Sequence, residues 1–180
     1  MKKLVLFLIS ILFISLAVNA QEFNYIGVKK CTMCHKTEKQ GSQLSIWEKS
    51  KHAEAYKTLQ TEKADKIAAE LGHTTKAVET PACLKCHATG YALQATRMEK
   101  GFDIADGVQC ETCHGAGKDY SVMKVMKDKQ ASIDAGLIVW ENDKAIEAQC
   151  RTCHNEESPT YKEFKFAESY KLIKHNIPKE

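Results

Sequence analysis

Cys31-Thr-Met-Cys-His35 is the first of four copies of one five-residue pattern that decides the fold of this 180-residue chain. The others are Cys83-Leu-Lys-Cys-His87, Cys110-Glu-Thr-Cys-His114 and Cys150-Arg-Thr-Cys-His154, and together they use all eight cysteines. C-x-x-C-H is the attachment pattern of c-type haem, in which the two cysteines form thioethers with the vinyl groups of the porphyrin and the histidine binds the iron. We therefore predict four covalent haem c groups. The attachment cysteines are Cys31, Cys34, Cys83, Cys86, Cys110, Cys113, Cys150 and Cys153, and the proximal iron ligands are His35, His87, His114 and His154.

Three other cysteine chemistries explain less of this pattern. Zinc sites use paired C-x-x-C motifs, but they do not require a histidine directly after each second cysteine. A thioredoxin-like redox pair needs one motif between a strand and a helix, not four copies spread along the chain. Disulfide frameworks of exported proteins rarely repeat one spacing followed by the same residue. Haem attachment is the interpretation that accounts for every cysteine and for the histidine behind each pair.

The first twenty residues have the pattern of a secretory signal peptide. Lys2 and Lys3 make a basic start, residues 4–18 are apolar, and Ala20 offers a small residue at a cleavage site. A membrane anchor is the alternative, because the apolar run approaches spanning length, but polar sequence follows it at once. We predict that residues 1–20 are cleaved, that the protein is secreted to the periplasm without a stable membrane anchor, and that 21–180 is one domain.

Composition and helical periodicity favour a mainly α fold of short helices and loops wrapped around four covalently bound haems. Aromatic residues make up only 8% of the chain, so a conventional core would be thin, and porphyrin faces would supply the missing apolar surface. The chain has 26 Lys and Arg against 23 Asp and Glu, which gives no support for nucleic-acid binding. Helices are predicted over 42–60, 61–71, from Asp119 or Ser121 to about 135, 143–150 and 160–175, with one short strand candidate at 137–140.

Three histidines lie outside the motifs, and they are the first candidates for the second axial position of each iron. They are His52, His73 and His175, and three side chains cannot serve four irons, so at least one haem is not bis-histidine. His52 lies on the apolar face of the predicted helix 42–60, and His175 is similarly placed near the end of the last helix. His73 follows Gly72 in a polar stretch that is more typical of a solvated loop.

Methionine is the usual alternative to histidine at this position. Met123 and Met126 are three residues apart on one predicted helix and can face the same side. We predict that Met123 or Met126 binds an iron, with packing against a porphyrin as the alternative role.

The residues around the motifs resemble those of the tetrahaem cytochrome c-554 family. The matching stretches are Gly27-Val-Lys-Lys-Cys-Thr-Met-Cys-His-Lys36, Trp47 with Ser50-Lys-His-Ala-Glu-Ala55, and Gly107-Val-Gln-Cys-Glu-Thr-Cys-His-Gly-Ala-Gly117. The order of the motifs and a final helix ending at His175 also fit, so the resemblance covers nearly the whole mature chain.

The resemblance implies a particular exchange of axial ligands. His52 would serve the third haem, which is attached at His114, and His175 would serve the first, at His35. The second haem, at His87, would be five-coordinate and open. The family takes the fourth haem's distal histidine from the helix after the third motif, but residues 120–127 contain no histidine. Met123 and Met126 are the obvious replacements there.

Closely packed haems pass single electrons, so the leading functional hypothesis is a periplasmic electron carrier. The resemblance implies redox protein partners: a periplasmic dehydrogenase or oxidoreductase, such as hydroxylamine oxidoreductase in nitrifying members, and a membrane quinone or cytochrome pool. The alternative is a small reductase that binds nitric oxide or another nitrogen oxide at an open second haem. Around residues 83–91 the sequence offers no clear acid–base pair, and His73 is the one titratable candidate. A stacked haem filament is a third possibility that no sequence feature favours.

Overall fold

The computed structural model describes residues 22–93 and 95–177, so the predicted signal peptide lies outside the described residues. The described part consists of short helices joined by loops, with one isolated parallel β-bridge between Tyr25 and Met98. The mainly α prediction is confirmed. The strand candidate at 137–140 is wrong, because this segment makes a single backbone hydrogen bond to the third motif, from Ile138 N–H to the His114 carbonyl at 2.9 Å. None of the described helices is long and apolar enough to cross a membrane.

The helices are short, and most contain one or two turns. The α-helices are α2 Val28–Cys31, α3 Gln43–Glu48, α4 Ala55–Thr58, α5 Glu62–Glu70, α6 Pro81–His87, α7 Cys110–His114, α8 Met123–Met126, α9 Lys129–Asp134, α10 Asp143–Arg151 and α11 Phe166–Ile173, and the 3-10 turns are η1 Ala77–Glu79, η2 Ala95–Arg97 and η3 Ile104–Asp106.

The predicted helix over 42–60 is interrupted, and α3 and α4 are its two remaining pieces. The break contains His52, whose carbonyl accepts hydrogen bonds from Ala55 N–H at 3.2 Å and from Val108 N–H at 3.0 Å. Because Val108 is distant in sequence, helical periodicity could not reveal that this carbonyl has a tertiary partner. The helix is therefore interrupted at His52, whose carbonyl pairs with Val108, two residues before the third motif.

Two predicted helices are confirmed where local capping specifies them. Thr61 precedes α5 and its hydroxyl accepts the N–H of Ala64 at 3.2 Å, while Gly72 follows α5 with φ of +83°. Asn142 caps α10 in the same way, accepting the N–H of Ala145 at 3.0 Å. Both signals involve residues within one turn of the helix end, which explains why sequence alone located them.

The other two predicted helices are shorter than expected. The segment from residue 119 to 135 divides into α8 and α9, because the Asp128 side chain accepts the N–H of Ala131 at 2.9 Å and starts a new helix there. Neither Asp119 nor Ser121 is the cap. The final helix α11 occupies only the second half of the predicted range 160–175.

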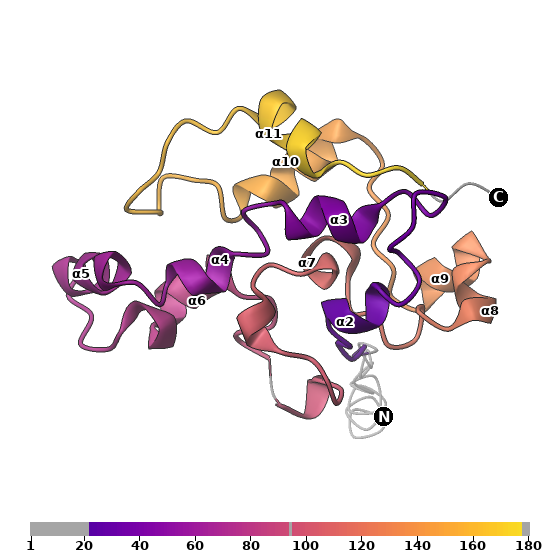
Figure 1. Cartoon of the computed structure of the whole chain (residues 1–180), viewed down its shortest axis with the longest axis horizontal. Helices are drawn as coiled ribbons and strands as arrows, with labels where there is room; N and C mark the ends of the chain where they lie inside the picture. The colour runs from indigo at the N-terminus through magenta and orange to yellow at the C-terminus, as the bar shows by residue number, and fades with distance from the viewer. Residues whose placement is uncertain (1–21, 94, 178–180) are drawn as a thin grey trace, which may run out of the picture.

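The polypeptide buries few large apolar side chains of its own. The largest fully buried side chains are polar, namely Gln109, Glu111, Thr80 and Ser132. One small apolar cluster of Leu59, Ala68 and Ala77 joins α4, α5 and η1, and α6 packs against it. In Figure 1, α4, α5 and α6 form one end of the molecule, α2, α8 and α9 form the other, and α7 lies between them. The motifs are thus distributed along the molecule with little protein core around them.

Candidate functional site

Each C-x-x-C-H motif is built as roughly one turn of helix. The third motif is α7 itself, the second forms the end of α6, and the first and fourth continue from the ends of α2 and α10. The N–H of His35 bonds the Cys31 carbonyl at 3.1 Å, and the N–H of His154 bonds the Cys150 carbonyl at 2.9 Å. Residues three and four positions apart share a helix face. Both thiols and the imidazole of each motif are thereby presented to the same side.

The thiols of different motifs lie close together and define a spatial order. The pKa of Cys31 is raised, chiefly because its thiol hydrogen-bonds that of Cys110. Burial raises the pKa of Cys86 to about 11, and the neighbouring Cys153 thiol adds to the shift and hydrogen-bonds it. Burial likewise raises the pKa of Cys113 to about 11, with Cys150 as the next cause. The first motif therefore adjoins the third, the third adjoins the fourth, and the fourth adjoins the second.

The structure brings two non-motif histidines next to motif histidines. The rings of His52 and His154 have centroids 6.1 Å apart, and those of His175 and His114 have centroids 5.7 Å apart. The charge of His175 contributes to the lowered pKa values of both His35 and His114, which indicates that His175 lies near His35 as well. The predicted roles of His52 and His175 as distal ligands stay predictions. What the structure adds is which motif histidines they face.

Burial favours the neutral form, which metal ligation requires, for the imidazoles of His35, His52, His114 and His154. It lowers the pKa of His114 to about 4, with His175 and His35 as smaller causes. Burial is also the main reason why the pKa values of His35, His52 and His154 lie below the ordinary value. A neutral imidazole offers a nitrogen lone pair to iron near neutral pH.

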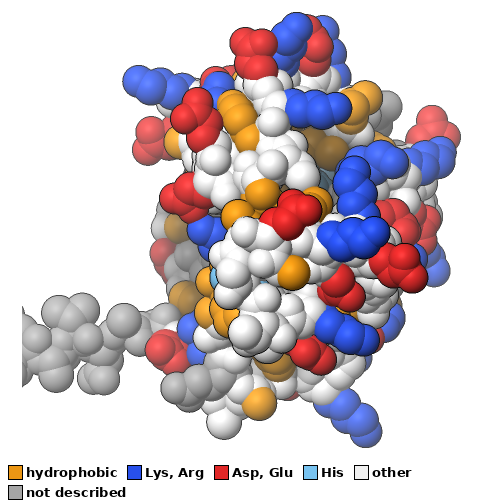
Figure 2. All heavy atoms as spheres, turned by 90° about the vertical axis from the view of Figure 1, so that its left-hand side faces the viewer, with side chains coloured by type: hydrophobic (Ala, Val, Ile, Leu, Met, Phe, Trp, Pro, Cys, Tyr) orange, Lys and Arg blue, Asp and Glu red, His pale blue; other side chains and the backbone are white. Residues whose placement is uncertain are grey.

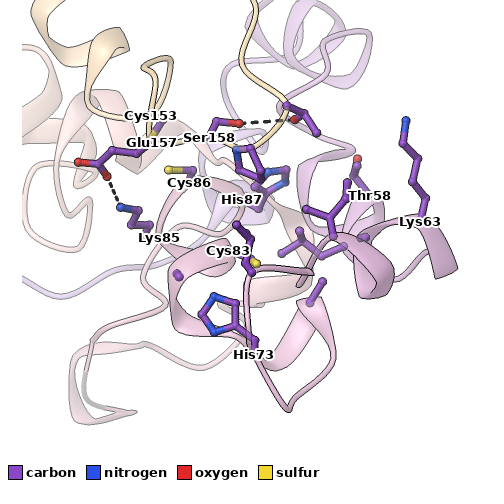
Figure 3. Close-up of a pocket in the computed structure, with 18 of the residues that line it drawn as sticks. Thr58, Lys63, His73, Cys83, Lys85, Cys86, His87, Cys153, Glu157 and Ser158 are labelled. Carbon is purple, nitrogen blue, oxygen red and sulfur yellow. Dashed lines mark hydrogen bonds and ion pairs between the residues drawn. The ribbon is translucent and has the colours of Figure 1, made fainter. Parts of the chain in front are cut away.

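The second motif opens into a cavity of about 300 Å³ (Figure 3). Cys83, Cys86 and His87 line it, together with residues of α5 and of the loop after the fourth motif. The Nδ1 atom of His87 lies 2.8 Å from the Ala55 carbonyl oxygen, which can only accept a hydrogen bond. Nδ1 therefore carries the proton and Nε2 keeps its lone pair, which is the arrangement that orients a metal-binding histidine. These residues fit a covalently attached haem.

His73 also lines this cavity, in the loop that follows α5. In the view of Figure 3, Cys83 lies between His87 and His73. The prediction that His73 is the one titratable side chain near the second motif is incomplete, because Lys63 and the ion pair of Lys85 with Glu157 lie there too. Lys63 and Glu157 are distant from this motif in sequence, and no local signal indicated them.

Met123 and Met126 form the two ends of α8, on the side of the molecule opposite α4, α5 and α6 (Figure 1). The Met123 side chain is 59% exposed. Helix α8 packs against α9, and the Ser132 hydroxyl bonds the Val125 carbonyl at 2.9 Å. The methionine ligand stays a prediction, and the contacts of His154 described above come from other residues.

One buried carboxylate holds the first and third motifs together, and sequence reasoning missed it. Glu111 is 2% exposed and accepts three backbone N–H groups, from Ile26 at 3.0 Å, Gly27 at 2.8 Å and Gly117 at 2.7 Å. Burial raises its pKa, and these three hydrogen bonds act in the opposite direction. Gln109 adds a parallel link to Val28 N–H at 2.7 Å. Glu111 occupies a variable position inside C-x-x-C-H, where the pattern carries no information about its partners.

Comparison with known proteins agrees with this geometry. A family model described as cytochrome c554 and c-prime matches residues 30–115, which include the first three motifs. Cytochrome c-554 of Nitrosomonas europaea is 29% identical over 149 residues, which cover 78% of this chain and 60% of that protein. Over these residues the chain is similar to the cytochrome c-554 family. It spans about 60% of the length of the curated relative that it matches. No solved structure gives a significant match.

The similarity to cytochrome c-554 supports a c-type cytochrome with covalently bound haem iron. The bound group supplies one-electron chemistry at iron. The protein's part is to hold each porphyrin by two thioethers, to supply neutral imidazoles, and to set the distance between neighbouring haems. The fourth motif lies beyond the matched segment 30–115, but it has the same sequence pattern and the same helical turn as the others.

Proposed function

We propose that this protein is a periplasmic tetrahaem electron carrier between a periplasmic redox enzyme and a membrane quinone or cytochrome pool. The observation that supports this most directly is the order in which the thiols of the four motifs neighbour one another in space. Neighbouring attachment points run from the first motif to the third, then the fourth, then the second. Haems attached at these points would form one unbranched chain, which is the arrangement that a relay of single electrons requires.

The two ends of this chain are where electrons would enter and leave. The first motif includes the exposed Cys34, and the second motif opens into the cavity between α5 and the 155–160 loop. Figure 2 views the α5 end of the molecule, where acidic and basic side chains alternate around patches of hydrophobic ones. A mixed, exposed surface of this kind suits brief docking of a redox protein, in which weak charge contacts orient the partner.

Periplasmic location is part of the proposal. Its basis is the signal-peptide pattern of residues 1–20 and the exported setting in which c-type haem proteins of this family are expected.

A reductive titration of the haem-loaded protein tests the carrier proposal. Intact mass should exceed that of the polypeptide from Gln21 by four haem masses, and anaerobic titration should take up four electrons per chain, one for each iron. Rapid reoxidation by an unrelated cytochrome c as electron acceptor should follow. A mass with three haems or fewer, or a fraction of iron that stays oxidised, would contradict the proposal.

A second candidate function is reduction of a small nitrogen oxide at the second haem. The observation that favours it is the cavity of about 300 Å³ beside His87, into which His73 and the Lys85–Glu157 pair bring titratable groups. Such a reaction consumes protons as well as electrons, so proton donors near the iron are required. Exposure of the reduced protein to nitric oxide should distinguish the carrier from the reductase. A carrier gives at most a stable nitrosyl spectrum, whereas the haems of a reductase are oxidised by nitric oxide again each time they are reduced.

A further inference from the structure

We propose that the buried carboxylate of Glu111 lowers the reduction potentials of the haems attached at the first and third motifs, and so sets the potential of one end of the electron relay. The inference rests on the proposed function, because it requires these two motifs to carry haems that pass single electrons. The side chain of Glu111 joins the two motifs through backbone hydrogen bonds, and its negative charge acts on both of them.

The hydrogen-bond partners of Glu111 fit the ionised carboxylate. All three are backbone N–H groups, and they donate from Ile26 and Gly117 to Oε1 and from Gly27 to Oε2. A protonated carboxyl has an O–H group that must itself donate, so protonation would sacrifice at least one of these bonds. Burial raises the pKa of Glu111, and the three hydrogen bonds oppose that rise. The negative charge is therefore held by N–H dipoles in place of water.

No cation pairs with this charge in residues 22–93 and 95–177, the part of the chain that the structure describes. Glu111 is one of three charged residues at the variable positions of the motifs, and the other two are Lys85 and Arg151. Lys85 pairs with Glu157 and Arg151 pairs with Glu147, and all four side chains are partly exposed. Glu111 is thus the buried charge without an ionic partner among the three.

Two thiols show which motifs the charge of Glu111 reaches. The pKa of Cys31 is raised mainly by its hydrogen bond to Cys110 and by burial, and the Glu111 charge adds to the rise. The same hydrogen bond lowers the pKa of Cys110, and the Glu111 charge opposes that fall. Burial is the main cause of the raised pKa values of Cys86 and Cys150, and the charges that act on them come from side chains beside the second and fourth motifs. The field of Glu111 is therefore directed at the first and third motifs.

The direction of the effect follows from the charge of the iron. A ferric haem carries one more positive charge than a ferrous haem, so a nearby negative charge stabilises the ferric form and lowers the reduction potential. Two unit charges about 10 Å apart, at an effective dielectric constant of about 20, shift such an equilibrium by roughly tenfold. A tenfold shift corresponds to about 59 mV for a one-electron couple. Water and salt would screen the same charge at the surface.

A spectroelectrochemical titration of the haem-loaded Glu111→Gln variant tests this role. Glutamine keeps the shape of the side chain and removes the charge. Two of the four midpoint potentials should therefore rise by about 59 mV or more, which is at least tenfold in the ferric–ferrous equilibrium, while the other two stay unchanged. Glu111→Ala removes the same charge and should raise the same two potentials. Four unchanged potentials, or an equal rise of all four, would overturn the proposal.

Two control variants separate the charge from the packing. Glu111→Asp keeps the charge on a shorter side chain, so it should lower the urea midpoint and leave the potentials close to those of the unmodified protein. Gln109→Leu removes the neighbouring bond to Val28 N–H without a change of charge, and should also leave the potentials unchanged. If either control raised the potentials as much as Glu111→Gln does, the effect would come from packing and the proposal would be wrong.

Failure of the carrier function has a different signature. Fewer than four haems by mass in the unmodified protein, or iron in it that stays oxidised, would count against the proposed tetrahaem carrier. Unchanged potentials in a fully loaded and fully reducible Glu111→Gln variant would count against the role of Glu111 alone.

Discussion

Replacing Glu111 with glutamine tests whether one buried carboxylate keeps the first and third motifs in register. The carboxylate accepts Ile26 N–H and Gly117 N–H through Oε1 and Gly27 N–H through Oε2. A glutamine of the same shape retains one acceptor oxygen, but its amide nitrogen can only donate. At least one of these backbone N–H groups is then buried without a partner.

The expected cost follows from that count. A buried donor without a partner costs about 1–3 kcal/mol. Burial of the charge already opposes the native state, since it raises the pKa of Glu111, and glutamine removes this penalty. We therefore expect Glu111→Gln to lower the free energy of unfolding by about 2 kcal/mol. Glu111→Ala, which leaves all three N–H groups unpaired and adds a cavity, should cost about 4 kcal/mol.

Urea unfolding of the haem-loaded protein, followed by far-ultraviolet circular dichroism, measures this cost. With a slope of about 2 kcal/mol per molar urea, Glu111→Gln should move the midpoint down by about 1 M. Glu147→Gln is the matched control, because Glu147 pairs with Arg151 at the surface and its loss should leave the midpoint unchanged. Equal midpoints for the two variants would refute the idea that Glu111 joins the motifs.

Three further predictions concern ligands and backbone. The low-spin absorption spectrum should stay constant from about pH 7 to about pH 5, because burial alone lowers the pKa of His114 to about 4 and iron ligation opposes protonation of this imidazole further. A transition near pH 6.5 would contradict this. Gly107→Ala should lower the free energy of unfolding, measured by urea unfolding, by about 3 kcal/mol, because φ is +76° and the new Cβ would meet the His52 carbonyl. Gly72→Ala should lower it by only about 1 kcal/mol, because φ is also positive there but the space around it is open. If Met123 or Met126 binds an iron, the double variant Met123→Leu/Met126→Leu should lose a weak red sulfur–iron band and one low-spin signal, whereas an unchanged spectrum would show that both methionines only pack.

Sequence reasoning succeeded where the chemistry lies within a few consecutive residues. Two thiols and an imidazole in one C-x-x-C-H turn need only five residues to form a haem-attachment unit. The ends of α5 and α10 were predictable for the same reason, since Thr61 and Asn142 cap the helix turn directly beside them.

Sequence reasoning failed where a distant residue competes with local preference. The apolar periodicity of 42–60 predicts one helix, but the His52 carbonyl pairs with Val108 and the helix divides. One local signal was also missed, because Asp128 caps α9 inside a segment whose periodicity predicts a continuous helix. Glu111 could be recognised as a buried link only when Ile26, Gly27 and Gly117 were placed around it.

The sequence by itself determined the kind of cofactor, the number of attachment motifs and the shortage of histidines for the second axial positions, because each depends only on residue identity and on spacing along the chain. The tertiary structure decided which motifs are neighbours and which imidazoles face each other, with His52 beside His154 and His175 beside His114. These pairings join residues 102 and 61 positions apart. Hydrogen bonds and packing between distant segments set them, and local sequence patterns carry no record of such contacts.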